Sequence, residues 1–157
     1  MSLDEPEAPA LPEGAVLASY GARVIGVFLD QVIAVVPVAI GAVAAGVRPG
    51  DKVATSTLAA LNVAAVVVLC VYQTVMVALL GRTVGKFATG TKVVRRDTGE
   101  RIGWFASAQR AIVTAVAGGV PQVALLLEGV VYGAAWFSPT RQGVHDRAAG
   151  TLVVRAR

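Results

Sequence analysis

The sequence predicts an all-α membrane protein, with three to four transmembrane or re-entrant helices and a small cytoplasmic β element. First, 55% of the 157 residues are apolar and only 15% are charged, and the mean hydropathy is +0.68, so the chain is more apolar than a soluble domain of this size. Second, three apolar stretches, residues 24–47, 58–80 and 111–137, each exceed the roughly 20 helical residues that cross a bilayer core. They do not alternate strictly, and backbone in lipid must satisfy its own hydrogen bonds, so helices are expected.

The chain is expected to divide into a leader and one membrane domain. Residues 1–18 are acidic and Pro-rich and offer little to bury, which predicts a disordered cytoplasmic tail. Residues 19–157 form the membrane domain. The first apolar stretch is not expected to be a cleaved signal peptide, because it is long, contains Asp30 and Gln31, and follows acidic residues.

The distribution of basic residues predicts the orientation of the spans. The predicted spans are residues 22–47, 57–80 and 105–137. Between the second and third lies a basic loop, residues 81–104. Lys and Arg concentrate on cytoplasmic loops. Residues 81–110, which include this loop, contain seven basic residues and two acidic ones, Asp97 and Glu100. The basic residues are Arg82, Lys86, Lys92, Arg95, Arg96, Arg101 and Arg110. The loop is therefore predicted to be cytoplasmic, the short connection with Arg48, Asp51 and Lys52 to be outside, and the amino terminus to be cytoplasmic.

The third apolar stretch is predicted to break near residues 118–121. The tail, residues 138–157, is also basic, so the same rule places it in the cytoplasm, which a third single span would not allow. The sequence AGGVPQ contains two glycines and Pro121, where a helix breaks and turns. A hairpin or re-entrant pair of short helices is favoured over one continuous span kinked at the proline.

Short β-branched runs predict the β element. TKVV at 91–94 and TLVV at 151–154 both lie beside basic residues, and we expect them to pair in one small sheet. A turn signal at Asp97-Thr98-Gly99 precedes Ile102, which predicts a hairpin with the tail as third strand.

Two charges lie in the first span. Arg23 is at its edge, where its long side chain can reach the head groups. Asp30 lies about 10 Å farther along the helix, where an isolated carboxylate costs a few kcal/mol and needs partners. Ala22 and Gly26 share its face, so a second helix can approach closely enough to supply hydrogen bonds.

Further polar residues at membrane depth complete a candidate ion site. Asn62, Gln73 and Thr74 in the second span are possible partners of Asp30. Gln122 and Glu128 in the third span need partners as well, and Arg110 can reach either head groups or a carboxylate. The candidate intramembrane polar site comprises Asp30, Gln31, Asn62, Gln73, Arg110 and Glu128. These residues either hold helices together or line a transport pathway, and the sequence leaves both readings open.

Several other functional classes lack support. GRTVGKFATG is too short between its glycines for a phosphate-binding loop. His145 is the single histidine and has no ligand cluster around it, so no metal and no cofactor are expected. The basic loop is explained by orientation and anionic lipid head groups rather than nucleic acid. Cys70 can form no internal disulfide. No nucleophile and base assemble, so an enzyme is not expected.

Three motifs in order give the chain a family resemblance. An Arg and an Asp in the first span, GRTVGKFATGTKVV and RQGVHDRAAGTLVV together resemble the RDD family of small bacterial multi-pass membrane proteins. The family's arginine and two aspartates then correspond to Arg23, Asp30 and Asp146. The remaining matches are Thr83, Gly85, Lys86, Gly90, Val93 and Val94, followed by Arg141, His145, Gly150, Thr151 and Val153. At Gly26 the family often has Ala. If the resemblance holds, Asp146 can pair with Arg23.

The resemblance implies a plasma-membrane protein that transports an unknown ion or solute, with cation/proton exchange proposed for some members. Pro37 and Pro121 are the kind of helix breaks that line ion sites. A chain with three or four short helices encloses little volume, so a homo-oligomer or a larger membrane complex is expected. The competing hypothesis is a non-transporting accessory or assembly subunit that packs on other membrane helices.

Overall fold

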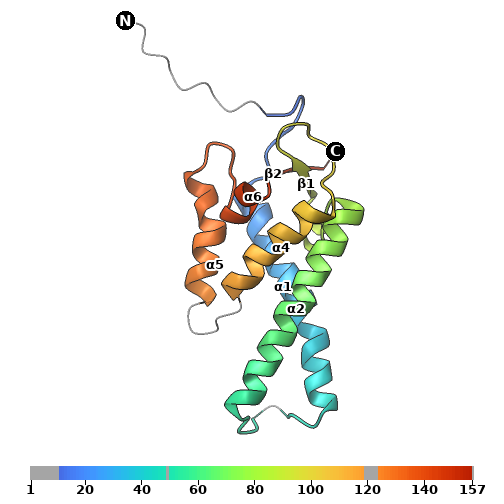
Figure 1. The fold of residues 1–157 in the computed structure, drawn as a ribbon, viewed down its shortest axis with the longest axis vertical. Coiled ribbons are helices and arrows are strands. Elements are labelled where there is room, and N and C mark those ends of the chain that lie inside the picture. The colour runs from blue at the N-terminus through green and yellow to red at the C-terminus, as the bar shows by residue number, and fades with distance from the viewer. Residues whose placement is uncertain (1–10, 49, 119–123, 157) are drawn as a thin grey trace, which may run out of the picture.

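The computed structural model describes residues 11–48, 50–118 and 124–156. The chain is mostly helical, with one small sheet at one end (Figure 1). In chain order the elements are α1 (Tyr20–Ala44), α2 (Thr55–Leu80), α3 (Val84–Ala88), β1 (Thr91–Arg95), α4 (Trp104–Gly118), α5 (Ala124–Gly133), the 3-10 helix η1 (Ala134–Phe137), α6 (Val144–Ala148) and β2 (Thr151–Arg155).

The helices α1 and α2 are long and apolar enough to cross a membrane. The Ser19 hydroxyl caps α1 by accepting a hydrogen bond from the Ala22 amide at 3.2 Å. Gly81 ends α2 with a φ of 70°, a left-handed conformation that glycine adopts without steric cost. Only 17% of the most apolar window of α1 and 6% of that of α2 are buried. A core helix of a soluble protein would be mostly buried, so these two helices belong to a membrane-type protein.

Two separate helices replace the third apolar stretch. The first, α4, ends at Gly118, and α5 begins at Ala124, on either side of the predicted break; residues 119–123, which include Pro121 and Gln122, lie outside the described residues. Figure 1 shows α4 running away from the sheet end and α5 returning toward it. The described helices therefore match the predicted pair of short helices rather than one continuous span.

The predicted pairing of the two β-branched runs is confirmed. The strands β1 and β2 are antiparallel, with Val93 opposite Val153 and Arg95 opposite Thr151. The predicted third strand around Ile102 is wrong, because no strand is assigned between β1 and α4 in this fully described part of the chain. Instead, the Arg95 amide donates to the Glu100 carbonyl at 2.8 Å, closing a turn, and the chain then enters α4.

The folded region begins before residue 19. Ala18 is fully buried, and its amide donates to the Val153 carbonyl at 3.0 Å. Leu17 bridges Val154, and the Arg155 amide donates to the Val16 carbonyl at 2.8 Å. Residues 16–18 thus run beside β2 as an extended segment, and Leu17 and Ala18 pack against the apolar clusters of the sheet. This corrects the predicted boundary of the leader, whose residues 1–10 lie outside the described part.

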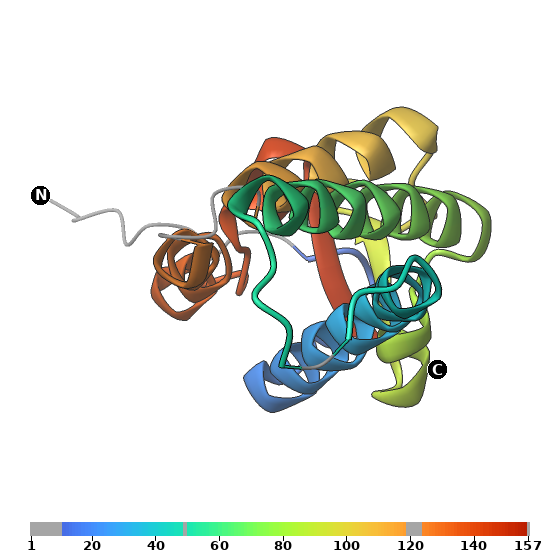
Figure 2. The same ribbon diagram turned by 90° about the horizontal axis from the view of Figure 1, so that it is seen from below.

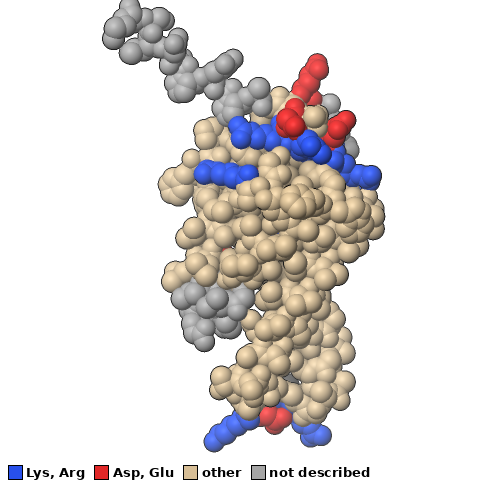
Figure 3. All heavy atoms as spheres, viewed as in Figure 1, with Lys and Arg blue, Asp and Glu red and all other residues tan. Residues whose placement is uncertain are grey.

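Apolar clusters and charges divide the molecule into zones. The larger cluster consists of Ala18, Val77, Val93, Ile102 and Val153, and it ties the sheet to α2. Figure 3 shows charged side chains at the two ends of the long axis and an uncharged band between them. At the far end the charged residues of the α1–α2 connection are Arg48, Asp51 and Lys52. An uncharged band between two charged ends is the surface that a bilayer requires.

Candidate functional site

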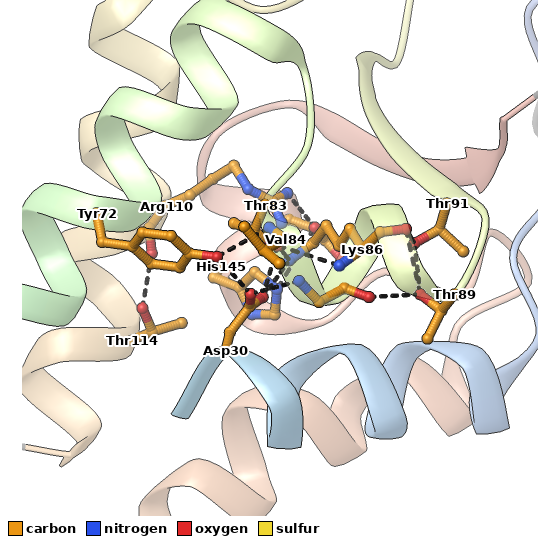
Figure 4. Close-up of polar contacts among 12 residues, drawn as sticks. Asp30, Tyr72, Thr83, Val84, Lys86, Thr89, Thr91, Arg110, Thr114 and His145 are labelled. Atoms are coloured by element: carbon orange, nitrogen blue, oxygen red, sulfur yellow. Dashed lines mark hydrogen bonds and ion pairs between the residues drawn. The ribbon is translucent and has the colours of Figure 1, made fainter. Parts of the chain in front are cut away.

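Asp30 lies at the centre of a buried polar cluster, which we call the Asp30 centre. The side chain is 1% exposed and accepts hydrogen bonds from the Tyr72 hydroxyl at 2.9 Å, the Thr83 hydroxyl at 2.5 Å and the Gly85 amide at 2.9 Å. The Lys86 ammonium lies 3.6 Å from the same carboxylate (Figure 4). Four donors therefore satisfy the acid, which removes the cost of burying it alone.

The Asp30 centre fastens the short helix α3 to α1. Thr83 caps α3, and its hydroxyl accepts from the Lys86 amide at 3.3 Å. The backbones of Gly85 and Gly26 meet so closely that a Cβ added at Gly85 would overlap the Gly26 carbonyl oxygen and lie 2.8 Å from Asp30 Oδ1. The predicted close approach on the Gly26 face is therefore present, but the approaching element is α3 rather than a second span.

The expected partners of Asp30 in α2 were wrong. Among the described residues, Asn62, Gln73 and Thr74 make no hydrogen bond to the Asp30 carboxylate, which binds the hydroxyl of Tyr72 instead. A phenol extends farther than an amide, so Tyr72 reaches across from α2. The sequence indicates the position of the remaining donors to Asp30 through Thr83, a residue type that often caps helices. Thr83 lies two residues after Gly81, which ends α2, and it caps the short helix α3.

A second cluster, the Asp146 centre, is built around the fully buried Asp146. Its carboxylate contacts the Arg110 guanidinium, accepts from Arg23 Nη1 at 3.1 Å and accepts from the Gly143 amide at 3.1 Å. His145 Nε2 lies 3.5 Å away. The pairing of Arg23 with Asp146 that the resemblance implied is present. Because Arg23 is 12% exposed and Arg110 7%, neither extends to head groups.

The Asp146 centre holds four segments together. Arg23 comes from α1, Arg110 from α4 and Asp146 from α6. Arg23 Nη2 also donates to the Val153 carbonyl of β2 at 3.2 Å, and Arg110 also contacts the Thr151 hydroxyl. Arginine suits this position because its planar fork can bond a carboxylate and a second acceptor together.

Electrostatics fix the protonation of the residues from α6. Burial alone would raise the pKa of Asp146, but Arg110, His145 and Arg23 outweigh it and hold that pKa well below its usual range. Burial lowers the pKa of His145 to about 4, and the neighbouring cations Arg110, Lys86 and Arg23 lower it further, against the opposing effect of Asp146. At neutral pH the carboxylate is ionised and the imidazole is neutral.

A cavity of about 390 Å³ lies beside both centres. Its lining comes chiefly from α1 and α5, and α5 stands apart from α1 and α2 when the molecule is viewed along its long axis (Figure 2). Its polar lining is Arg23, Gln31, Gln73, Lys86, Thr91, Arg110, Glu128 and His145, and its aromatic lining is Tyr20, Phe28, Tyr132 and Trp136. Gln31 donates to Glu128 at 3.3 Å within this lining.

The six predicted intramembrane residues do not form one cluster. Asp30 belongs to its own centre, Arg110 belongs to the Asp146 centre, and Gln31, Gln73 and Glu128 line the cavity with Arg110. Asn62 is 11 residues before Gln73 in α2, about 16 Å farther along the helix, and is not part of the described lining. The motif residues Thr83, Gly85 and Lys86 belong to the Asp30 centre, and His145 contacts the Asp146 centre. Gly90 follows α3 with a φ of 61°, as the turn into β1 requires.

The described residues contain no group of three or more His, Cys, Asp or Glu side chains that could hold a metal ion. Arginine, lysine, hydroxyl and backbone groups engage the two central carboxylates, and His145 Nε2 lies 3.5 Å from Asp146. The chemistry of both centres is therefore charge neutralisation and hydrogen bonding within the protein.

Comparison with models of known protein families shows to which family the chain belongs. A sequence model of the RDD family matches residues 17–150, which is most of the chain. The chain belongs to the RDD family. Comparisons with curated proteins and with solved structures gave no match. The matched region of this RDD protein contains Arg23, Asp30 and Asp146, which lie in the two centres.

Proposed function

We propose that this RDD protein crosses the bacterial plasma membrane twice, through α1 and α2. At about 1.5 Å per residue each helix rises about 38 Å, which exceeds the roughly 30 Å of the hydrocarbon core. The helices α4 and α5 rise only about 22 and 15 Å by the same measure. They enter the bilayer as a re-entrant pair and return to the side from which they came.

Exposed aromatic side chains support this placement. Large rings favour the level of the head groups. Five aromatic residues of the helices near the sheet end are each more than half exposed. They are Phe87, Trp104, Phe105, Trp136 and Phe137. The basic loop lies at the same end as these rings, which favours a cytoplasmic location for the sheet, the loop and the tail.

We propose further that the protein is a transporter subunit whose ligand site is the cavity beside the two centres. The observation that carries this is the cavity between α1 and α5, which is lined by Arg23, Lys86 and Arg110. The carboxylates that neutralise these cations, Asp30 and Asp146, already accept several hydrogen bonds each. The lining also contains Glu128, which binds Gln31. Three cations and one acid on the cavity wall favour an anionic solute over an exchanged cation.

A single protomer does not enclose a path across the bilayer. At the end of the molecule away from the sheet, α1, α2 and their connection extend beyond the other described elements (Figure 1). Transport therefore requires several copies around a shared path.

Purification in mild detergent followed by mass measurement of the particle tests this proposal. We expect a discrete homo-oligomer. A monomer, or a stoichiometric complex with a different membrane protein, would contradict it, and the complex would favour the accessory role.

A further inference from the structure

The cavity lies between α1 on one side and α5 with η1 on the other. Two contacts bridge α1 to the segment formed by α5 and η1. At one level the Tyr20 ring stacks on Trp136 with centroids 5.4 Å apart, and the Tyr20 hydroxyl donates to the Ala135 carbonyl at 3.2 Å. At the other level Gln31 binds Glu128. The 11 residues between these levels leave about 16 Å of helix as a window.

The edges of this window are apolar. Val24 and Phe28 line the cavity and are 57% and 66% exposed. On the opposite edge Gly129 has no side chain, and a Cβ built there would have nothing within 4 Å. In a protein placed in the membrane as above, this window faces hydrocarbon, so a ligand enters it from the bilayer more readily than from water.

The floor of the cavity is cationic and incompletely satisfied. It contains Arg23, Lys86, Arg110 and the largely buried His145. Among the described residues, Arg23 Nε and His145 Nδ1 are buried without a hydrogen-bond partner. A buried polar atom without a hydrogen-bond partner costs free energy, and a ligand that forms the missing hydrogen bond removes this cost. The Lys86 ammonium lies 3.6 Å from Asp30 and donates to the Thr83 hydroxyl at 3.4 Å, so one of its three N–H donors is left for a further acceptor.

We propose that the cavity binds one anionic phospholipid from the cytoplasmic leaflet, with its phosphate against Arg23, Lys86 and Arg110. Its acyl chains leave through the window between α1 and α5, against Val24 and Phe28. A charged head and an apolar body match a cationic floor and an apolar opening, whereas a zwitterionic lipid also places a cation against the floor. This inference rests on the proposed function, because it names the ligand class of the same cavity.

Native mass spectrometry tests the inference on the full-length protein released from bilayer discs of phosphatidylcholine and phosphatidic acid. We expect one phosphatidic acid per protomer, retained at least about tenfold over phosphatidylcholine, a preference equivalent to about 1.4 kcal/mol. Gly129→Leu fills the window and should abolish retention. Gly133→Leu is the matched control, because this glycine lies in the same helix, also has open space around its Cβ position and does not line the cavity.

A second pair of variants tests the charge of the cavity. Gln73→Glu adds an acid to the lining and should lower phosphatidic acid retention severalfold. Asn62→Asp adds the same charge in the same helix, away from the cavity, and should leave retention unchanged. Equal retention of the two lipids, equal loss in both leucine variants, or displacement of the lipid by inorganic phosphate alone would overturn the inference.

The same spectra separate this inference from the proposed function, because they count protomers as well as lipids. An oligomer without phosphatidic acid overturns the lipid site and leaves the transporter assignment intact. A monomer that retains phosphatidic acid overturns the transporter assignment and supports the lipid site.

Discussion

Neutralising Asp146 should destabilise the fold strongly. The Asp146→Asn substitution keeps the side-chain shape and an oxygen that can accept from the Gly143 amide, but it removes the negative charge. Arg23 and Arg110, which are 12% and 7% exposed, would then lack their counterion. Breaking a buried ion pair by removing one partner costs about 3–5 kcal/mol, and we expect a loss of this size in the free energy of unfolding.

The assay is equilibrium unfolding in mixed micelles, followed by the fluorescence of Trp104 and Trp136. Asp97→Asn is the control, because Asp97 pairs with Arg95 at 3.8 Å with both side chains more than half exposed, and such a pair contributes about 0–1 kcal/mol. Adding Arg110→Met to Asp146→Asn should recover part of the loss. The reasoning is refuted if Asp146→Asn and Asp97→Asn unfold at the same denaturant concentration.

Three further predictions concern the same contacts. Gly85→Ala should destabilise the protein by about 1–3 kcal/mol through overpacking. In Gly26→Ala the new methyl group meets the movable Thr89 hydroxyl at 3.2 Å, so this variant should change stability little. Equal thermal denaturation midpoints of the two variants would contradict this prediction. Asp30→Asn should leave Lys86 unpaired and cost about 3 kcal/mol, and Lys86→Met in the same chain should recover part of this in a double-mutant cycle; strictly additive losses would argue against coupling. Burial lowers the pKa of His145 in the folded state to about 4, so the unfolded state binds a proton at higher pH than the folded state does. The contribution of His145 to the free energy of unfolding should therefore stay constant above pH 6.5 and fall by up to about 3 kcal/mol between pH 6.5 and pH 4. A His145→Gln variant that keeps the full slope in a pH series would contradict this origin.

Features that follow from residue type and charge were predictable from the sequence. The short β-branched runs at residues 91–94 and 151–154, each beside basic residues, predicted the pairing that the sheet shows. The glycines and Pro121 predicted the separation of α4 from α5. Asp30 needed donors on energetic grounds, and the structure supplies four.

Features that depend on the packing of distant segments were not predictable. The choice of Tyr72 rather than Gln73 depends on how α2 is rotated against α1, which the nearly uniform apolar sequence of α2 does not indicate. The cavity is bordered by contacts of Tyr20 with Trp136 and of Gln31 with Glu128, and these contacts join segments that are distant in the chain, so they have no local sequence signal. The turn signal at residues 97–99 predicts a strand around Ile102, but that residue is buried in the core outside any strand instead.

The central claim is that the charged, sheet-bearing end of this RDD protein lies in the cytoplasm while α1 and α2 cross the bilayer. Lys52→Cys and Thr98→Cys, each in a Cys70→Ser background, place one thiol at either end of the molecule. A membrane-impermeant maleimide should label the Lys52→Cys variant in intact cells, and should label the Thr98→Cys variant only after the cells are opened. Labelling of Thr98→Cys in intact cells would contradict the account.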